Sequence, residues 1–273
     1  MYFKFRVRGP YATALSKLIL DTDNYLVDLS DQLAQRLGLP QRKNEVPNAT
    51  IKVSDDDGDA LVIIGKRDAV ETALKIFKTG IPYISYELNI YGPYTTVMAK
   101  TLGTKDNTCV AEFHNMLLLL QNSRSCDENT DVMVYIVKPA TLRNTVAVAF
   151  KGIAIIKDTL VLLADGMGRV FFSEHIKDYK RKAELLALSN NIARQGYSIR
   201  WRSSAKNAQL EKIAKDLEEA LEELKKISSR SYSVGDVVAE GEAIAFVRLS
   251  RPSKEYLDGV RNSVVPTALG TTS

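Results

Sequence analysis

The chain has 273 residues, of which 45% are hydrophobic and 26% are charged, and its formal net charge is +4. This composition is ordinary for a globular protein of about two domains, and the small positive charge is compatible with an anionic partner without indicating one. No run approaches the roughly 18 apolar residues of a transmembrane helix, and the first ten residues alternate as in a strand, which argues against a signal peptide.

Residues 1–80 are predicted to form a small α/β domain. The patterns indicate strands at 3–8, 25–29, 49–53 and 60–64, and helices at 11–20, 31–38 and 67–78. Ser30 is predicted to cap the second helix, and Gly38 to end it. The acidic run at 54–59 resembles a metal loop, but an EF-hand starting at Asp55 needs glycine and glutamate where Ala60 and Lys66 stand. A hairpin turn at Asp57-Gly58 explains the run better.

Residues 81–141 contain five short predicted strands, at 83–90, 95–99, 108–113, 116–120 and 132–137. Strands this closely spaced predict a small barrel of the S1/OB type, which binds nucleic acid by stacking bases on exposed aromatic rings. The candidate contact residues are Tyr91, Tyr94, Phe113 and His114. Few lysines or arginines accompany them, so a structural barrel with aromatic core residues is the alternative.

Residues 142–227 are predicted to form a second α/β region, with strands at 146–150, 160–164 and 169–172 and a helix at 176–193. The helix carries Arg181 among three lysines and follows His175. Such a run is usually a solvated helix face. It becomes a candidate for RNA contact because more positive residues follow it in the chain.

The segment GYSIRWRSSAKNA, residues 196–208, is the strongest candidate site. A strand here places Arg200 and Arg202 on one face and Ile199 and Trp201 on the other. Ser203, Ser204 and Lys206 follow, and a charged helix is expected from 206 to 227, whose N-terminus offers free N–H groups to a phosphate. In the alternative interpretation Ser204 only caps the helix and the arginines are solvated.

The helix at 206–227 also has a narrow apolar stripe, which suits internal packing or a contact with a partner or a second copy of the chain. Residues 228–273 are predicted as an extension with a strand at 242–249 and a helix at 253–260. The last residues, 265–273, have the composition of a linker, which indicates passage to a further domain.

No catalytic motif is recognisable. Cys109 and Cys126 lack metal-ligand spacing and are expected to be reduced thiols of a cytoplasmic protein. The segment 165–168 (DGMG) is predicted as a hairpin turn and not as a phosphate loop. Carboxylates that could bind Mg²⁺ are scattered along the chain, and the sequence brings no two of them together: Asp158, Asp165, Glu174, Asp178, Glu240 and Asp258.

Several segments resemble one family. They are 6–21 (RVRGPYATALSKLILD), 134–163, 171–178 (FFSEHIKD), 196–205 (GYSIRWRSSA) and 260–267 (VRNSVVPT). Together they are similar to the archaeal AU-rich-RNA-binding proteins related to ribonucleases E and G, over nearly the whole chain. The resemblance implies a multi-domain α/β (α+β) fold, with an S1-type barrel at 81–141, a region at 142–227 similar to the sensor of the RNA 5′ end, and an extension at 228–273.

The resemblance also implies a function. Arg202-Ser203 stands where ribonucleases E and G carry an Arg-Thr pair that holds a 5′-monophosphate. The expected activity is an endoribonuclease that acts on ribosomal RNA precursors or AU-rich RNA, with Mg²⁺ as cofactor. The segment that binds catalytic Mg²⁺ in ribonucleases E and G has no counterpart here, so no catalytic residue can be assigned. A non-catalytic RNA-binding module and a protein-interaction scaffold remain alternatives.

Overall fold

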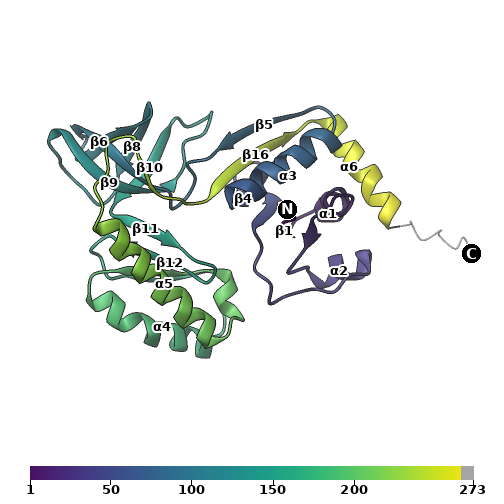
Figure 1. Ribbon diagram of the computed structural model, residues 1–273. Helices are drawn as coiled ribbons and strands as arrows, with labels where there is room; N and C mark the ends of the chain where they lie inside the picture. Colours follow the sequence, from purple (N-terminus) through teal and green to yellow (C-terminus); the bar gives the residue numbers. More distant parts are fainter. Residues whose placement is uncertain (266–273) are drawn as a thin grey trace, which may run out of the picture. The chain divides into compact units, whose positions relative to one another are not determined.

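The computed structural model describes residues 1–265 (Figure 1). Contacts divide the chain into two units, one formed by Met1–Ile90 with the residues from Ala243 onward, the other by Tyr91–Glu242. The mixed α/β class is confirmed. Among the described residues, no helix combines the length and apolarity needed to cross a membrane. The linker-like segment predicted at 265–273 lies, apart from Val265, outside the described part of the chain.

The first unit contains a six-stranded sheet with the order β2-β1-β3-β4-β16-β5. β1 is parallel to β2 and β3, and the other neighbours are antiparallel. The hairpin predicted at Asp57-Gly58 joins β3 to β4. The strands of this sheet are β1 (Lys4–Val7), β2 (Tyr25–Leu26), β3 (Ala49–Val53), β4 (Ala60–Gly65), β5 (Ile84–Asn89) and β16 (Ala243–Leu249).

Four helices complete this unit: α1 (Ala12–Leu20), α2 (Asp31–Leu37), α3 (Arg67–Gly80) and α6 (Arg251–Val264). The predicted cap of α2 is confirmed, because Ser30 accepts from the N–H of Leu33 and Gly38 ends the helix at a φ of 64°. α1, α3 and α6 bury Leu15, Phe77 and Leu257 in one core with the sheet. This unit is therefore a sheet covered by helices, with its last strand and helix taken from the end of the chain.

The second unit begins with a closed five-stranded barrel. Its strands run in the order β6-β7-β8-β10-β9, and β9 pairs back to β6. The bounds are β6 (Thr96–Lys105), β7 (Thr108–Phe113), β8 (Met116–Leu120), β9 (Glu128–Lys138) and β10 (Val146–Lys151), and β15 (Val237–Ala239) adds to the outer edge of β6. Alternate residues such as Val97, Ala111 and Ile136 fill the barrel. The predicted OB-type barrel is thus confirmed in kind.

One barrel strand was wrongly predicted. The strand expected at 83–90 is β5, which pairs with β16 in the first unit. Its place in the barrel is taken by β10, which pairs with β8 and β9. Short spacing along the chain suggested that neighbouring strands pair. The partner of β5 instead lies about 160 residues further on, where no local pattern could indicate it.

The two cysteines, expected as reduced thiols, form a disulfide. Cys109 on β7 is joined to Cys126, which lies 17 positions later in the segment before β9. β8 separates the two cysteines in sequence, and the segment before β9 returns to β7, where the N–H of Cys109 donates to the carbonyl of Ser123 at 2.9 Å. The expectation of free thiols is therefore corrected.

Reduction of this disulfide should lower the free energy of unfolding by about 3 kcal/mol, because the cross-link restricts the unfolded chain. The measurement is a urea titration with and without dithiothreitol. The Cys109→Ala/Cys126→Ala variant serves as control, since the reductant should leave its transition unchanged. Equal transitions for the oxidised and reduced chain would contradict the expected stabilisation.

A second sheet follows the barrel, with four strands in the order β11-β12-β14-β13. They are β11 (Ile153–Ile156), β12 (Leu160–Ala164), β13 (Val170–Phe172) and β14 (Ser198–Trp201), of which only β11 was not predicted. Helices α4 (Tyr179–Arg194) and α5 (Leu210–Ser228) pack on one side of this sheet (Figure 1). Val161 and Leu163 on the other side pack against Tyr94, Tyr135 and Phe150 at the barrel. The second side is called the barrel-facing side below.

Candidate nucleic-acid interface

The alternation predicted for β14 is confirmed. Ile199 and Trp201 are fully buried beneath α4 and α5, whereas Arg200 is exposed and Arg202 half-buried. The indole N–H of Trp201 donates to Ser189 Oγ on α4 at 2.9 Å. Because successive residues of a strand point to opposite sides, this anchor directs both arginines to the barrel-facing side.

Arg202 already has partners within the chain. Its guanidinium donates to the carbonyl of Lys157 at 2.9 Å and to Glu242 Oε1 at 2.7 Å. The Glu242 side chain is only 15% exposed, so this ion pair is partly shielded from water. A guanidinium has five N–H donors, and the remaining ones can still meet a second acceptor. A phosphate at Arg202 would share the cation with a carboxylate.

Arg200 differs from Arg202 in its polar contacts. Among the described residues it has no hydrogen bond and no ion pair, and its charge acts on the Tyr94 hydroxyl. Burial raises the pKa of Tyr94 above its ordinary value, and the positive charge of Arg200 partly opposes that rise. Arg202 has the same effect on Tyr94, to a smaller degree. Packing agrees with this electrostatic link, because Tyr94 packs against Val161, the register partner of Arg200 on β12.

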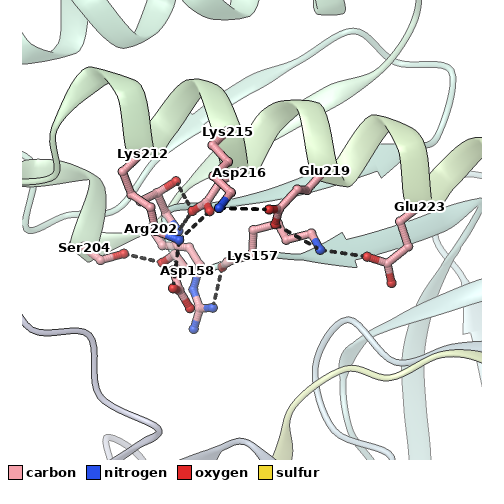
Figure 2. A network of polar contacts seen from close by, with 10 residues as sticks. Lys157, Asp158, Arg202, Ser204, Lys212, Lys215, Asp216, Glu219 and Glu223 are labelled. Carbon is pink, nitrogen blue, oxygen red and sulfur yellow. Dashed lines mark hydrogen bonds and ion pairs between the residues drawn. The ribbon is translucent and has the colours of Figure 1, made fainter.

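The residues after β14 differ from the prediction. Ser203–Lys206 form a short 3-10 turn, and the long helix begins only at Leu210. The free N–H groups of α5 therefore do not adjoin Arg202, and Ser204 does not cap that helix. Ser204 Oγ instead donates to the carbonyl of Asp158 (Figure 2). Lys206 is exposed, and Ser203 is half-buried.

Arg181 holds this turn in place. Its Nε donates to the carbonyl of Ala205 at 2.9 Å, a second guanidinium nitrogen donates to Ala208, and a third pairs with Glu184 at 3.0 Å. The side chain is only 12% exposed. The predicted contact residue Arg181 is thus used to shape the segment between β14 and α5. This local bracing explains why the helix starts four residues later than predicted.

The turn between β11 and β12 is tied to α5 by a buried carboxylate (Figure 2). Asp216 Oδ2 accepts from the backbone N–H and the hydroxyl of Thr159, at 3.0 and 2.8 Å, and Asp216 Oδ1 pairs with Lys212 at 2.7 Å. Lys212 also pairs with Asp158 at 3.1 Å. The hydrogen bond to Asp216 raises the pKa of Lys212 above its usual value. Sequence analysis did not single out Asp216, because it is one of many acidic residues on this helix and most of the others are exposed.

The other predicted contact residues have different partners. His175 is exposed, and its ring nitrogen lies 3.6 Å from Glu174. Phe113 is buried in the barrel core, where Tyr91 and His114 contact its ring. His114 Nε2 is 2.9 Å from the carbonyl of Gly235. Phe113 therefore serves the barrel core, where Tyr91 and His114 contact its ring, whereas Tyr94 packs with a different cluster that contains Val161 and Leu163.

Some of the candidate acids have polar partners within the chain. Within residues 1–265 no group of three or more His, Cys, Asp or Glu side chains could hold a metal ion. Asp165 accepts from the hydroxyls of Tyr135 at 3.2 Å and Ser198 at 2.8 Å, and Asp158 pairs with Lys212. No cleavage step that uses the Mg²⁺ implied by the resemblance is derived from these residues.

Comparison with known proteins places this geometry in context. No protein-family model matches the chain. A protein of Hyperthermus butylicus named probable ribonuclease FAU-1 is 35% identical over 268 residues, which are 97% of this chain and 56% of that protein. This chain is a homologue of archaeal proteins of that name. Proteins of the same name from Ignicoccus hospitalis and Sulfurisphaera tokodaii are each 30% identical, over 97% of this chain and 55% and 56% of their own lengths.

The resemblance to an archaeal ribonuclease family is thereby confirmed, over nearly all of the chain. The chain spans little more than half the length of these probable ribonucleases FAU-1. Their names give ribonuclease as a probable activity and give no catalytic detail. The activity of these whole proteins is therefore assigned to this chain only as a proposal.

Proposed function

We propose that this chain binds single-stranded RNA through Arg200, Arg202 and Tyr94 and serves as the RNA-engaging part of a ribonuclease. One observation supports this most strongly. Arg200 is exposed, has no acceptor among the described residues, and lies on the same side of the sheet as Arg202, where its register partner Val161 packs against Tyr94. A guanidinium without an internal partner on such a side of the sheet is well suited to a phosphate of the RNA backbone.

The names of the relatives support the choice of RNA over other anionic ligands. The OB-type barrel beside the arginines fits the same choice, because such barrels commonly hold single strands. The finer proposal comes from the resemblance: the RNA is AU-rich or a ribosomal precursor, and Arg202-Ser203 holds its 5′-monophosphate. Since Glu242 already accepts from Arg202, Arg200 is expected to make the first phosphate contact.

Arg200→Ala should weaken the binding of a 5′-monophosphorylated AU-rich single strand by about 1–3 kcal/mol, because a charge-assisted hydrogen bond is lost. The dependence of log K on log salt should also fall by about 0.7, the value for one phosphate contact on a single strand. Both are measured by fluorescence anisotropy over a salt series. Arg194→Ala is the matched control, because Arg194 is equally exposed but ends α4 on the opposite side of the sheet.

Equal losses in the two arginine variants would show a general effect of charge and contradict a site at Arg200. The same mixtures, with Mg²⁺ added, test cleavage. Products above a control without the chain would support the ribonuclease. Intact RNA with retained binding would favour the alternative, a non-catalytic RNA-binding module.

A further inference from the structure

Phe171 is an aromatic residue that does not pack in a hydrophobic core of the described residues. It lies on β13, at the edge of the four-stranded sheet, and is partly exposed. Its neighbours Val170 and Phe172 pack into the core beneath α4 and α5, whereas Phe171 belongs to none of the apolar cores of the described residues. Because strand residues alternate, its ring points to the barrel-facing side. Core packing does not explain an aromatic residue there.

The surroundings of Phe171 are basic. The guanidinium of Arg169, an exposed residue, lies 5.4 Å from the centre of its ring. On the adjacent strand, Arg200 is the direct register partner of Phe171, so the two side chains stand next to each other on one side of the sheet. The ring therefore has two cationic residues as neighbours, and one of them is the proposed phosphate contact.

We propose that Phe171, with Arg169, forms a stacking site for one unpaired nucleobase of an RNA whose phosphate is bound by Arg200. This inference rests on the proposed function. An aromatic ring next to a guanidinium offers a flat apolar surface and a cation, and single-strand-binding proteins combine these two groups to hold successive bases and phosphates. Every base has a π-face, so the site accepts any base and contributes affinity without sequence preference.

The first test compares the affinity of three variants for a 5′-monophosphorylated AU-rich single strand. Phe171→Ala should weaken binding by about 5- to 160-fold, the range for loss of one base–aromatic stack, and Phe171→Tyr should keep nearly full affinity. Tyr179→Ala is the matched control. Tyr179 is an exposed aromatic residue with the Lys182 ammonium 5.9 Å from its ring, but Lys182 also contacts Phe172 on the helix-covered side. Its removal should leave affinity unchanged.

A second test identifies the stacked base. Abasic nucleotides are placed one at a time along the RNA, and binding is measured with the natural chain and with Phe171→Ala. At one position the loss from the abasic site and the loss from the variant should be strongly non-additive, because both remove the same stack. Phe171→Trp provides an optical readout. The only natural tryptophan is buried, and the fluorescence of the new indole should be quenched by intact RNA but not by RNA that is abasic at that position.

The outcomes separate the two proposals. If the chain binds RNA, loses affinity with Arg200→Ala and keeps it with Phe171→Ala, the stacking site is overturned and the proposed function stands. Additive losses at every abasic position would also overturn it. If the natural chain binds no RNA, both proposals fail. Phe171→Ala should keep the thermal midpoint of the natural chain, because its side chain lies outside the cores.

Discussion

Trp201→Ala is expected to lower the free energy of unfolding of the second unit by about 3–5 kcal/mol. Trp201 is fully buried and is the largest side chain in the core beneath α4 and α5. Its replacement leaves a cavity and removes the hydrogen bond to Ser189 Oγ, which is itself buried. The measurement is chemical denaturation of the natural chain and the variant, followed by circular dichroism.

The conservative variant Trp201→Phe should cost less, because a ring still fills part of the space and mainly the bond to Ser189 is lost. RNA binding should fall together with stability in Trp201→Ala, since Trp201 anchors the strand that directs Arg200. A stable Trp201→Ala chain would show that this core does not hold β14 in place. Retained RNA affinity in a destabilised Trp201→Ala chain would show that the RNA contact at Arg200 does not depend on the anchor at Trp201.

Asp216→Ala should have a comparable effect, a loss of about 3–5 kcal/mol, because it removes the acceptor from a buried network. The backbone N–H and the hydroxyl of Thr159 both donate to this carboxylate, and Thr159 is 1% exposed. The pair with Lys212 adds little, since the Lys212 side chain is 43% exposed. Thermal and urea denaturation measure the change.

Glu219→Ala is the matched control on the same helix. Glu219 is about half exposed, and its pairs with Lys157 and Lys215 measure 4.0 and 3.8 Å, so its loss should stay within about 0.5 kcal/mol. Asp216→Asn keeps an acceptor oxygen and should lie between the two. A loss for Asp216→Ala no larger than that for Glu219→Ala would contradict the buried network.

The sequence was informative wherever neighbouring residues decide the structure. Period-two alternation correctly indicated β14, with Trp201 inward and Arg200 outward, and Ser30 and Gly38 indicated the ends of α2. Such signals arise within a single turn or strand. These signals can be interpreted without knowing which elements pack against the segment, because the pattern itself indicates which side is buried.

The features that were missed depend on residues far apart in the chain. Glu242 meets Arg202 across 40 positions, and Asp216 meets Thr159 across 57. Nothing around either acid distinguishes it from its exposed neighbours. Likewise, Arg181 resembled the other cations of its helix, and only the path of residues 203–208 turns it inward. The sequence thus predicted which way the side chains of β14 point. It did not predict which groups of the same chain pair with Arg202, Asp216 and Arg181.

The position of β16 has a consequence for how the protein assembles during synthesis. β16 lies between β4 and β5, so the first unit lacks a central strand until the ribosome has made residues 243–249. Residues 91–242, in contrast, are contiguous and can fold as soon as they emerge. The amino-terminal sheet therefore keeps an unpaired edge while about 150 further residues are synthesised. Its folding is completed later than that of the second unit, and its exposed edge makes it the more prone of the two to aggregate.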